Sequence, residues 1–392
     1  MGRIKRGVSL YSYQQAQFFK ILDVWQQIKE VRENCHTDGI EIISQQAIYD
    51  YPFPSDRWTA KWFDTMQEHG MNAVAYDPHL DVLQFRDHVM DAAEGAERLK
   101  RDIRLAKRLG FKIVRVHQSQ TLPGDTMAIF EKCLPVAEEL DIPMALEIHA
   151  PMSLKGRFTT DIIEYAEKHD VVDLLGIYPD LGIYQKRIQT PLAEWNIRKG
   201  CPREIIDIIQ NICDTGLVDQ ISMNLRTPES FQHYENYTAR GIELPDDADP
   251  GIKEYIAYIE SIVEKPSPRD YDLFSWPLKL PRFDGSELRD VIRYVKGFHA
   301  KFYDMTEIPG TPGHYEDISV DYETPFSVLK ETGWEGYLNS ENEGQRHYQD
   351  QDFEAYQDDI EQVRRNQEWM ARLIGEDFVF PEKNYEYKAH IL

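Results

Sequence analysis

A chain of 392 residues with 42% apolar content is long enough to bury a sizeable core. Its formal net charge of −24 argues against nucleic acid and anionic membrane surfaces as partners, because both are themselves negatively charged. No stretch approaches the apolar length of a membrane span, and the first apolar run is too short for a secretory signal, so we expect a soluble cytoplasmic protein.

The four cysteines (Cys35, Cys133, Cys201 and Cys213) are scattered, and no two of them have C-x-x-C spacing. Such usage is typical of a reducing compartment, so we expect free, buried thiols.

Strand and helix signals alternate along the first half of the chain, which is the pattern of a parallel sheet built from βα units. Apolar runs predict strands at 5–13, 39–44, 71–77, 111–117, 142–149 and 174–178. Amphipathic segments between them predict helices at 16–34, 57–69, 87–109, 125–140 and 158–169.

The alternation then breaks over a segment that we place at 183–283. This segment is rich in Pro, Asp and aromatic residues and contains helix-like pieces near 203–213 and 250–264. Because it lacks a long apolar core pattern of its own, we predict an insertion on the rim of the main domain and not a separate domain.

The alternation resumes beyond residue 284. We predict helical periodicity at 288–295, strands at 297–303 and 334–341, and helices at 325–332 and 351–374. Eight strands separated by helices predict a (β/α)₈ TIM barrel in a single domain, 1–375, with a large insertion after the sixth strand. A C-terminal extension, 376–392, is rich in aromatic residues that we expect to pack on a neighbouring surface or a partner.

Four consecutive strand ends carry side chains of the kind that bind metals: Glu147, Asp180, His299 and Glu341. In such barrels the active site lies at the carboxyl ends of the strands, so these side chains are predicted to converge there. Three carboxylates and one imidazole suit Mn²⁺ or Mg²⁺, whereas zinc more often attracts histidine and cysteine.

Each of these residues also has a purely structural explanation. Glu147 and His149 lie on one face of a strand and would make a buried salt-bridged pair. Asp180 would cap a turn, His299 would be a core histidine, and Glu341 would pair with an arginine. The set of four in consecutive strands favours the metal site.

With these four positions in place, the sequence resembles the xylose-isomerase-like barrels, a superfamily of sugar isomerases and epimerases. The resemblance covers the eight strands, and the order and spacing of the motifs I-Y-P-D (177–180) and S-E-N-E-G (340–344) carry it. It implies a divalent metal, Mn²⁺ first and Mg²⁺ second, ligated by Glu147, Asp180, His299 and Glu341.

A second group of residues surrounds the predicted ligands. His149 is our candidate for the general base, because a neutral imidazole titrates near working pH; the alternative is a hydrogen-bonded rim histidine. Lys301 would bind a carbonyl, or would form an ion pair with Glu343 or Asp304. Glu343 would contact substrate or complete a pair of acid and base groups.

Six further side chains are considered near the same mouth. His117 would touch a sugar hydroxyl, and Arg346, with its neighbour His347, would reach the substrate from the segment after the eighth strand. Tyr11, Tyr13 and Trp276 would form an apolar platform for a ring, although ordinary packing is the better explanation for these three.

Such a site suits proton abstraction next to a sugar carbonyl, which serves epimerisation, isomerisation or β-elimination. The Glu341–Arg346 run, the chain length and the long insertion resemble the alpha subunit of C-glycoside deglycosylases. That resemblance implies cleavage of 3-oxo C-glucosides by β-elimination and assembly with a smaller β subunit.

Other functions remain open at this point. A metal-dependent sugar isomerase or epimerase would use the same ligands, and a 3-oxo O-glycoside lyase would use the same chemistry. A barrel subunit with a structural or lost metal site would serve as a carbohydrate-binding scaffold. A nuclease of the same barrel type is disfavoured, because a net charge of −24 repels phosphates.

Overall fold

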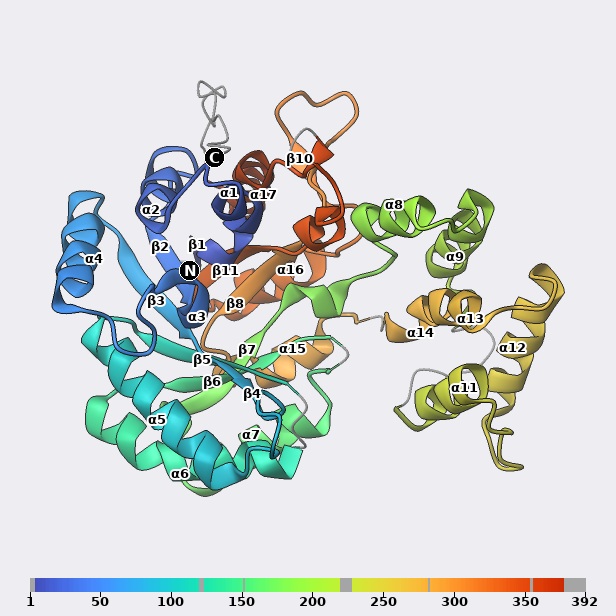
Figure 1. Ribbon diagram of the computed structural model, residues 1–392, viewed down its shortest axis with the longest axis horizontal. Coiled ribbons are helices and arrows are strands. Elements are labelled where there is room, and N and C mark those ends of the chain that lie inside the picture. The colour runs from blue at the N-terminus through green and yellow to red at the C-terminus, as the bar shows by residue number, and fades with distance from the viewer. Residues whose placement is uncertain are drawn as a thin grey trace.

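The computed structural model has a central barrel of parallel strands surrounded by helices, with a second group of helices on one side (Figure 1). It describes residues 4–119, 123–150, 152–218, 228–280, 283–352 and 355–376. The eight barrel strands are β1 (Ile4–Ser9), β2 (Gly39–Ile43), β3 (Asn72–Asp77), β5 (Ile113–Ser119), β6 (Met144–Ile148), β7 (Leu175–Pro179), β8 (Phe298–Phe302) and β11 (Gly336–Asn342).

The strands pair in parallel in the order β7-β6-β5-β3-β2-β1-β11-β8. Two isolated parallel bridges, Ile177–Val295 and Asp180–His299, join β7 to β8 and nearly close the cylinder. The predicted (β/α)₈ barrel is therefore confirmed. A short strand, β4 (His79–Asp81), extends the sheet beside β5 at the mouth.

Helices cover the outside of the barrel (Figure 1). They are α2 (Val24–Glu33), α4 (Asp56–Glu68), α5 (Ala92–Arg108), α6 (Pro123–Leu140), α7 (Arg157–Lys168), α15 (Ser286–Val291), α16 (Glu323–Thr332) and α17 (Asp359–Ile374). Two short helices, α1 (Gln14–Phe18) and α3 (Ser44–Ala47), lie at the mouth of the barrel. Short 3₁₀ turns follow several strands: η1 (Leu10–Tyr13), η2 (Leu181–Tyr184), η3 (Ile292–Tyr294) and η4 (Gly344–Tyr348).

The alternation of side chains along each strand separates two environments. On β2, Ile40 and Ile42 are fully buried in the main hydrophobic cluster. Glu41, between them, hydrogen-bonds to residues of β7, β8 and β11 and therefore points into the barrel. Apolar outer faces thus pack against the helices, and polar side chains collect inside the cylinder.

Three predicted helices begin or end elsewhere than expected. The predicted helix at 16–34 is broken, because Lys20 takes a left-handed conformation and Asp23 starts α2 with a capping box. Asp91 caps α5 and so delays its start from 87. Likewise, Asp358 caps α17 by accepting from the Glu361 N–H, so the last helix begins at Asp359 and not at 351.

The insertion forms a lobe beside the barrel (Figure 1). Its helices are α8 (Thr190–Arg198), α9 (Arg203–Thr215), α11 (Pro228–Arg240), α12 (Pro250–Ile262), α13 (Pro268–Phe274) and α14 (Trp276–Lys279). They enclose a hydrophobic cluster that includes Ile209, Ile252 and Phe274, each fully buried. The sequence pattern did not reveal this shared interior, because each short helix contributes only a few apolar residues to it. The domain boundaries at 183, 283 and 375 stay predictions.

Two further segments complete the description. A small hairpin, β9 (Thr306–Glu307) with β10 (Tyr315–Glu316), follows β8 and was not predicted. Of the C-terminal extension, only Glu376 lies among the described residues, where it pairs with Arg6 at 2.7 Å. The proposed packing of the rest of the tail lies outside the described residues.

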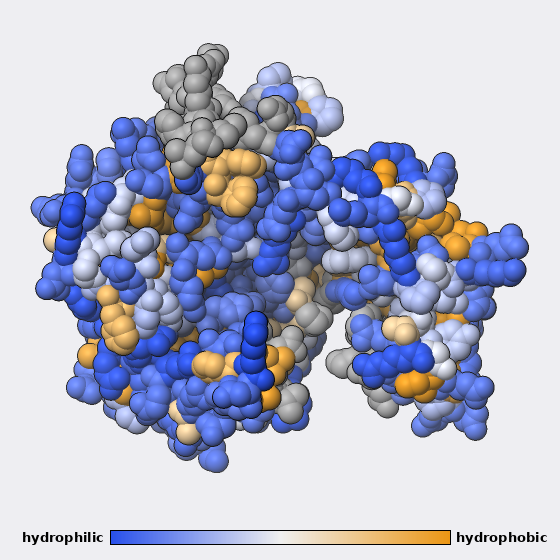
Figure 2. Space-filling view, viewed as in Figure 1, coloured by the Kyte–Doolittle hydropathy of each residue, from blue (hydrophilic) through white to orange (hydrophobic). Residues whose placement is uncertain are grey.

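The surface and the cysteines agree with the composition. The face of the molecule seen in Figure 2 is largely hydrophilic, with separate apolar patches on the barrel and on the insertion lobe. All four cysteines are free and buried, as predicted. Within the described part of the chain, the helices are all too short or too polar to cross a lipid bilayer.

One buried carboxyl group makes the stability of this fold depend on pH. Asp359, at the start of α17, is fully buried, and its Oδ2 accepts hydrogen bonds from the backbone N–H groups of Gln15 (2.8 Å) and Ala16 (3.1 Å). Burial outweighs these bonds and raises the pKa of Asp359 to about 8. The folded state therefore holds a proton that the unfolded state releases near pH 4.

We predict that protonated Asp359 stabilises the fold at low pH. As the pH rises from about 4 to about 8, its contribution to the free energy of unfolding should fall by up to about 1.4 kcal/mol per pH unit. Asp359→Asn removes the ionisation, so the free energy of unfolding of the variant relative to wild type should increase between about pH 5 and about pH 8. Urea denaturation across that range measures the difference. The exposed control Asp246→Asn should show a constant difference, and a constant difference for Asp359→Asn as well would contradict the prediction.

Candidate metal centre

The four predicted ligands converge inside the mouth of the barrel. One ligand atom from each of Glu147, Asp180, His299 and Glu341 lies within 4.8 Å of the other three, and all four residues are buried. His299 Nδ1 is 2.8 Å from Glu147 Oε1, 3.0 Å from Glu341 Oε2 and 3.8 Å from Asp180 Oδ2. A buried acidic and histidine cluster of this size can bind a metal ion.

Asp180 fills both roles considered from the sequence. Its Oδ1 caps the turn η2 by accepting from the Gly182 N–H at 2.6 Å, whereas its Oδ2 faces the cluster. Asp180 Oδ2 and Glu341 Oε2 are buried and receive no well-directed hydrogen bond, although the Lys301 ammonium lies 2.9 and 2.7 Å from them. These oxygens keep lone pairs for a cation, so the residues present fit a divalent metal.

Glu41 fixes the orientation of His299. Its Oε1 lies 2.7 Å from His299 Nε2, and its Oε2 accepts hydrogen bonds from Tyr178 and Asn339, both at 2.8 Å. Burial would raise the pKa of Glu41, but the facing His299 lowers it. An ionised Glu41 accepts a hydrogen bond from Nε2–H, so Nδ1 is the nitrogen that faces the other three carboxylates, where a bound cation would replace its proton. Carboxylate–histidine pairs of this kind orient metal ligands in many proteins.

Glu147 does not pair with His149, so that alternative was wrong. Its Oε2 instead binds Arg115 at 2.7 Å and His117 at 2.5 Å, which leaves Oε1 toward His299. Burial would raise the pKa of Glu147, but Arg115 and then His299 hold it well below its usual value. Arg115 also binds Asp77 at 2.9 Å, so one buried guanidinium anchors two carboxylates.

Negative charge exceeds fixed positive charge at this centre. Six carboxyl groups are buried here: Glu41, Asp77, Glu147, Asp180, Glu341 and Glu343. Burial raises the pKa of Asp77 well above its usual value, so the negative charge comes chiefly from the other five. Only two permanently charged side chains of comparable burial accompany them in the described structure, Arg115 and Lys301. Burial opposes a charged His299, yet Glu341 and Glu41 raise its pKa well above the usual value. The centre thus draws in positive charge, which a divalent cation supplies.

His149 lies one residue beyond β6 and faces the cavity beside the cluster. Its Nδ1 donates to the carbonyl of Ala150 at 2.7 Å, so the rim hydrogen bond considered from the sequence is present. Its Nε2 lies 3.5 Å from Lys301 Nζ and 3.8 Å from both Asp180 and Glu343. Burial and Lys301 would lower the pKa of His149, but Asp180 and Glu343 raise it to about 9.

Lys301 forms the predicted ion pair with Glu343 at 3.1 Å, and it contacts Asp180 and Glu341 in place of Asp304. Glu341 correspondingly pairs with this lysine and His299 and not with an arginine. Arg346 binds the other side of Glu343 at 3.0 Å. Glu343 is therefore held between two cations.

The cluster opens into a cavity of about 710 Å³. The predicted residues that line it are His117, Glu147, His149, Lys301, Glu341, Glu343 and Arg346. Tyr11 also lines it, and its hydroxyl accepts from Arg346 Nε at 2.7 Å. His79 of β4 lies beside His117, with ring centroids 4.7 Å apart. The volume is that of a small-molecule site.

Three residues mentioned from the sequence lie elsewhere. His347 packs near Trp195 of the insertion, with ring centroids 6.1 Å apart. Tyr13 is fully buried next to Cys35, and Trp276 packs on the hydrophobic cluster of the insertion. For Tyr13 and Trp276, ordinary packing was the correct explanation.

Sequence reasoning missed Glu41, Asp77, Arg115 and His79. Glu41 and Arg115 each interrupt an apolar strand, and this was the available signal: a charged residue flanked by buried ones must face a polar barrel interior. Asp77 ends the third strand just as Glu147 comes at the end of the fifth. His79 belongs to a strand, β4, that was not predicted.

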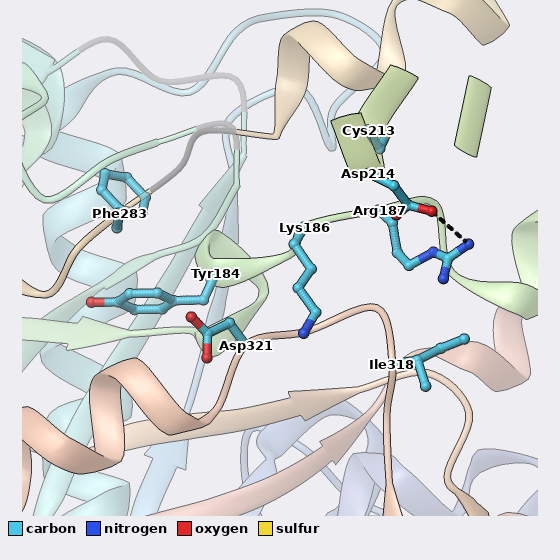
Figure 3. A pocket seen from close by; sticks show the side chains of 8 residues that line it. All are labelled: Tyr184, Lys186, Arg187, Cys213, Asp214, Phe283, Ile318 and Asp321. Atoms are coloured by element: carbon cyan, nitrogen blue, oxygen red, sulfur yellow. Dashed lines mark ion pairs between the residues drawn. The ribbon is translucent and has the colours of Figure 1, made fainter. Parts of the chain in front are cut away.

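A separate cavity of about 470 Å³ lies where the chain leaves the barrel for the insertion (Figure 3). Lys186 points into it, and Arg187 turns toward Asp214 at 3.5 Å. Tyr184 and Phe283 come from the two ends of the insertion. None of the site residues predicted from the sequence is among those described as lining this cavity.

Comparison with known proteins adds to this geometry. No protein-family model matches the chain. It is 26% identical over 376 residues to a 3'-dehydrocarminate deglycosidase alpha subunit of a Microbacterium species, covering 94% of this chain and 95% of that protein. The chain resembles C-glycoside deglycosidase alpha subunits. One from Arthrobacter globiformis is 25% identical over 342 residues, which cover 87% of this chain and 85% of that protein.

Among solved structures, L-ribulose 3-epimerase superposes with a TM-score of 0.51 and covers 95% of each chain at 13% identity. This likeness shows the shared barrel fold. Because the relatives are deglycosidase subunits and a charged, buried site lies at the mouth of the barrel, the chain is an enzyme.

We predict that Asp180→Asn weakens the binding of Mn²⁺ by more than about 100-fold, because it replaces the ligand oxygen Oδ2 while its remaining oxygen still caps η2. Titration calorimetry on metal-free protein measures the affinity. Asp321→Asn, which alters a carboxylate of the separate cavity, is the control and should bind as wild type. Equal affinity of Asp180→Asn and wild type would remove Asp180 from the ligand set.

We predict that Glu41→Gln weakens metal binding by about 10- to 100-fold, although Glu41 is not one of the four ligands. The glutamine amide has only one oxygen, whereas Glu41 uses one oxygen for His299 and the other for Asn339. If the amide oxygen accepts from His299, the amide NH₂ group faces the NH₂ group of Asn339, and the two donors repel each other. The glutamine is therefore not held in place, and His299 loses its fixed orientation. The same calorimetric titration measures the change. Metal affinity unaffected by the substitution would show that His299 needs no orienting carboxylate.

Proposed function

We propose that the chain is the catalytic, alpha-type subunit of a metal-dependent lyase that cleaves 3-oxo C-glucosides by β-elimination. Glu147, Asp180, His299 and Glu341 hold the metal, for which Mn²⁺ is our first candidate and Mg²⁺ the second. The observation that carries the proposal is the place of His149 Nε2, which faces an open cavity directly beside the ligand cluster. A base is thus placed next to the position where a sugar carbonyl would be held.

The metal, when bound, would polarise the 3-oxo group and stabilise the negative charge that develops on it. Asp180 and Glu343 raise the pKa of His149 in the absence of a metal, and a cation bound by Asp180 would oppose that rise and favour the neutral ring. Neutral His149 uses Nε2 as the base, because its Nδ1 proton is bound by the Ala150 carbonyl. His149 removes the proton from C2, and the electron pair forms the C1=C2 double bond. The C1–carbon bond to the aglycone then breaks, and its electron pair takes up a proton on the aglycone carbon, so the reaction needs no other reactant.

The remaining polar side chains position the sugar. Lys301 lies 3.5 Å from His149 Nε2 and donates to the substrate oxygen nearest the base. His117 and Arg346, on opposite sides of the cavity lining, reach sugar hydroxyls, and Glu343 holds both Lys301 and Arg346 in place. These assignments follow from which polar atoms line the cavity.

The arrangement favours elimination over epimerisation at one carbon. An epimerase that works on both faces needs two groups that exchange protons. Here Glu343, the carboxylate nearest to His149 outside the ligand set, is bound by two cations at 3.0 and 3.1 Å, which makes it a poor second base beside His149. The named activities of the relatives point the same way. A metal-dependent sugar isomerase or epimerase is the alternative.

The relatives are named alpha subunits, so we propose that this chain also works with a second, smaller subunit. Its substrate is a small sugar derivative. A cytoplasmic location remains our prediction.

We predict that His149→Ala retains metal binding but loses at least about 100-fold in the cleavage of a 3-oxo C-glucoside, because the base is removed while the four ligands stay. Product formation and calorimetric Mn²⁺ binding are measured on the same preparation. His69→Ala, which changes a histidine at the end of α4, is the control and should cleave as wild type.

Two outcomes would contradict the proposal. Cleavage by His149→Ala at the wild-type rate would remove His149 from the mechanism. Consumption of free ketoses by the wild-type enzyme, with no cleavage of the 3-oxo C-glucoside, would establish the isomerase or epimerase instead.

A further inference from the structure

A second hollow adjoins the cavity of the metal centre. It has a volume of about 600 Å³, and it shares three lining residues with that cavity: Gln14, Gln46 and Gln349. These shared side chains make the two hollows adjacent. A ligand that reaches from the metal centre into the second hollow would cross only this shared lining.

The second hollow has an unusual lining. Its described lining residues are six glutamines and two phenylalanines: Gln14, Gln15, Gln17, Gln46, Gln349, Gln351, Phe18 and Phe19. We call this the glutamine groove. It is built by the segments that follow three neighbouring strands, β11, β1 and β2. In contrast to the cavity at the metal, the described lining of the groove carries no charged side chain.

Phe18 offers an aromatic surface at the groove. It is 77% exposed, and its ring packs edge-on against Phe19 at a centroid distance of 5.1 Å and an interplanar angle of 81°. Phe19 in turn packs on Tyr356 at 5.4 Å. The inner ring is thus supported by the fold, and the outer ring is left open for a planar partner.

The amide groups are held in a partial network. Gln14 donates to Gln46 Oε1 at 3.3 Å, and Gln17 donates to the Gln46 carbonyl at 3.4 Å. Each carboxamide has two N–H donors and an oxygen acceptor, and hydrogen bonds of 3.3 and 3.4 Å are long and therefore weak. Several of these donors and acceptors can therefore bind a ligand. Amides beside an aromatic ring match a flat ligand that carries hydroxyl groups and no charge.

We infer that the glutamine groove is the subsite for the aglycone, and that it selects an uncharged, hydroxylated aromatic ring system. This inference rests on the proposed function, which places the sugar at the metal centre and the aglycone on the bond that breaks. The volume of the groove lies in the range of small-molecule sites.

The test measures binding without turnover. A trihydroxyflavone is titrated into the metal-loaded protein, and its affinity is compared for wild type, Phe18→Ala, Gln46→Ala and the control Phe53→Ala. Phe53 is 75% exposed, like Phe18, but does not line the groove. Phe18→Ala and Gln46→Ala should each weaken binding by about three- to tenfold, and Phe53→Ala should not change it.

A second comparison separates the groove from the reaction. With a 3-oxo C-glucoside of a hydroxyflavone, Phe18→Ala and Gln46→Ala should raise KM by a similar factor. Phe18 does not line the cavity of the metal centre, so Phe18→Ala should keep the wild-type KM for proton exchange at C2 of methyl 3-oxo-glucoside, which has no aromatic aglycone. Wild-type flavone affinity in both variants, with normal cleavage, would overturn the groove and leave the proposed function intact. Flavone binding that both variants weaken, in a protein that cleaves no 3-oxo C-glucoside, would support the groove and overturn the proposed function. Absence of flavone binding to the wild type would also overturn the aglycone subsite.

Discussion

The site depends on one histidine held between carboxylates on both sides of its ring. His299 Nε2 faces Glu41 at 2.7 Å, and His299 Nδ1 faces Glu147 and Glu341 at 2.8 and 3.0 Å. Glu41 is itself fixed by Tyr178 and by an asparagine of β11, so the ring cannot turn without breaking several buried hydrogen bonds. This arrangement fixes Nδ1 beside a cluster of carboxylate oxygens, so that one nitrogen and several oxygens are already in place for a cation, as a preorganised metal site requires.

The same cluster of buried carboxylates costs stability when no cation is bound. Buried carboxylates are costly unless cations compensate them, and Arg115 and Lys301 compensate only part of the negative charge. The barrel tolerates the excess because its outer faces are packed with apolar side chains, while its inner face is lined by hydrogen-bonding groups. Stability and function are thus divided between the two faces of each strand.

Much of this could be predicted from the sequence. The barrel followed from the alternation of strands and helices, and the convergence of the four predicted ligands followed from the rule that strand ends meet at one mouth. The role of Glu41 could not be predicted, because its partner His299 is 258 residues away and their contact depends on the closure of the barrel. The helix breaks were missed because single caps such as Asp23 override a continuing amphipathic pattern. The core of the insertion was missed because it forms only when several short helices assemble.

The central claim is that Glu147, Asp180, His299 and Glu341 bind one divalent cation. An anomalous difference map from crystals grown with Mn²⁺ tests it most directly. We predict one strong peak at roughly 2.0–2.3 Å from His299 Nδ1 and from an oxygen of each carboxylate. A map with no peak at this position, or with a peak that touches fewer than three of the four residues, would contradict the account.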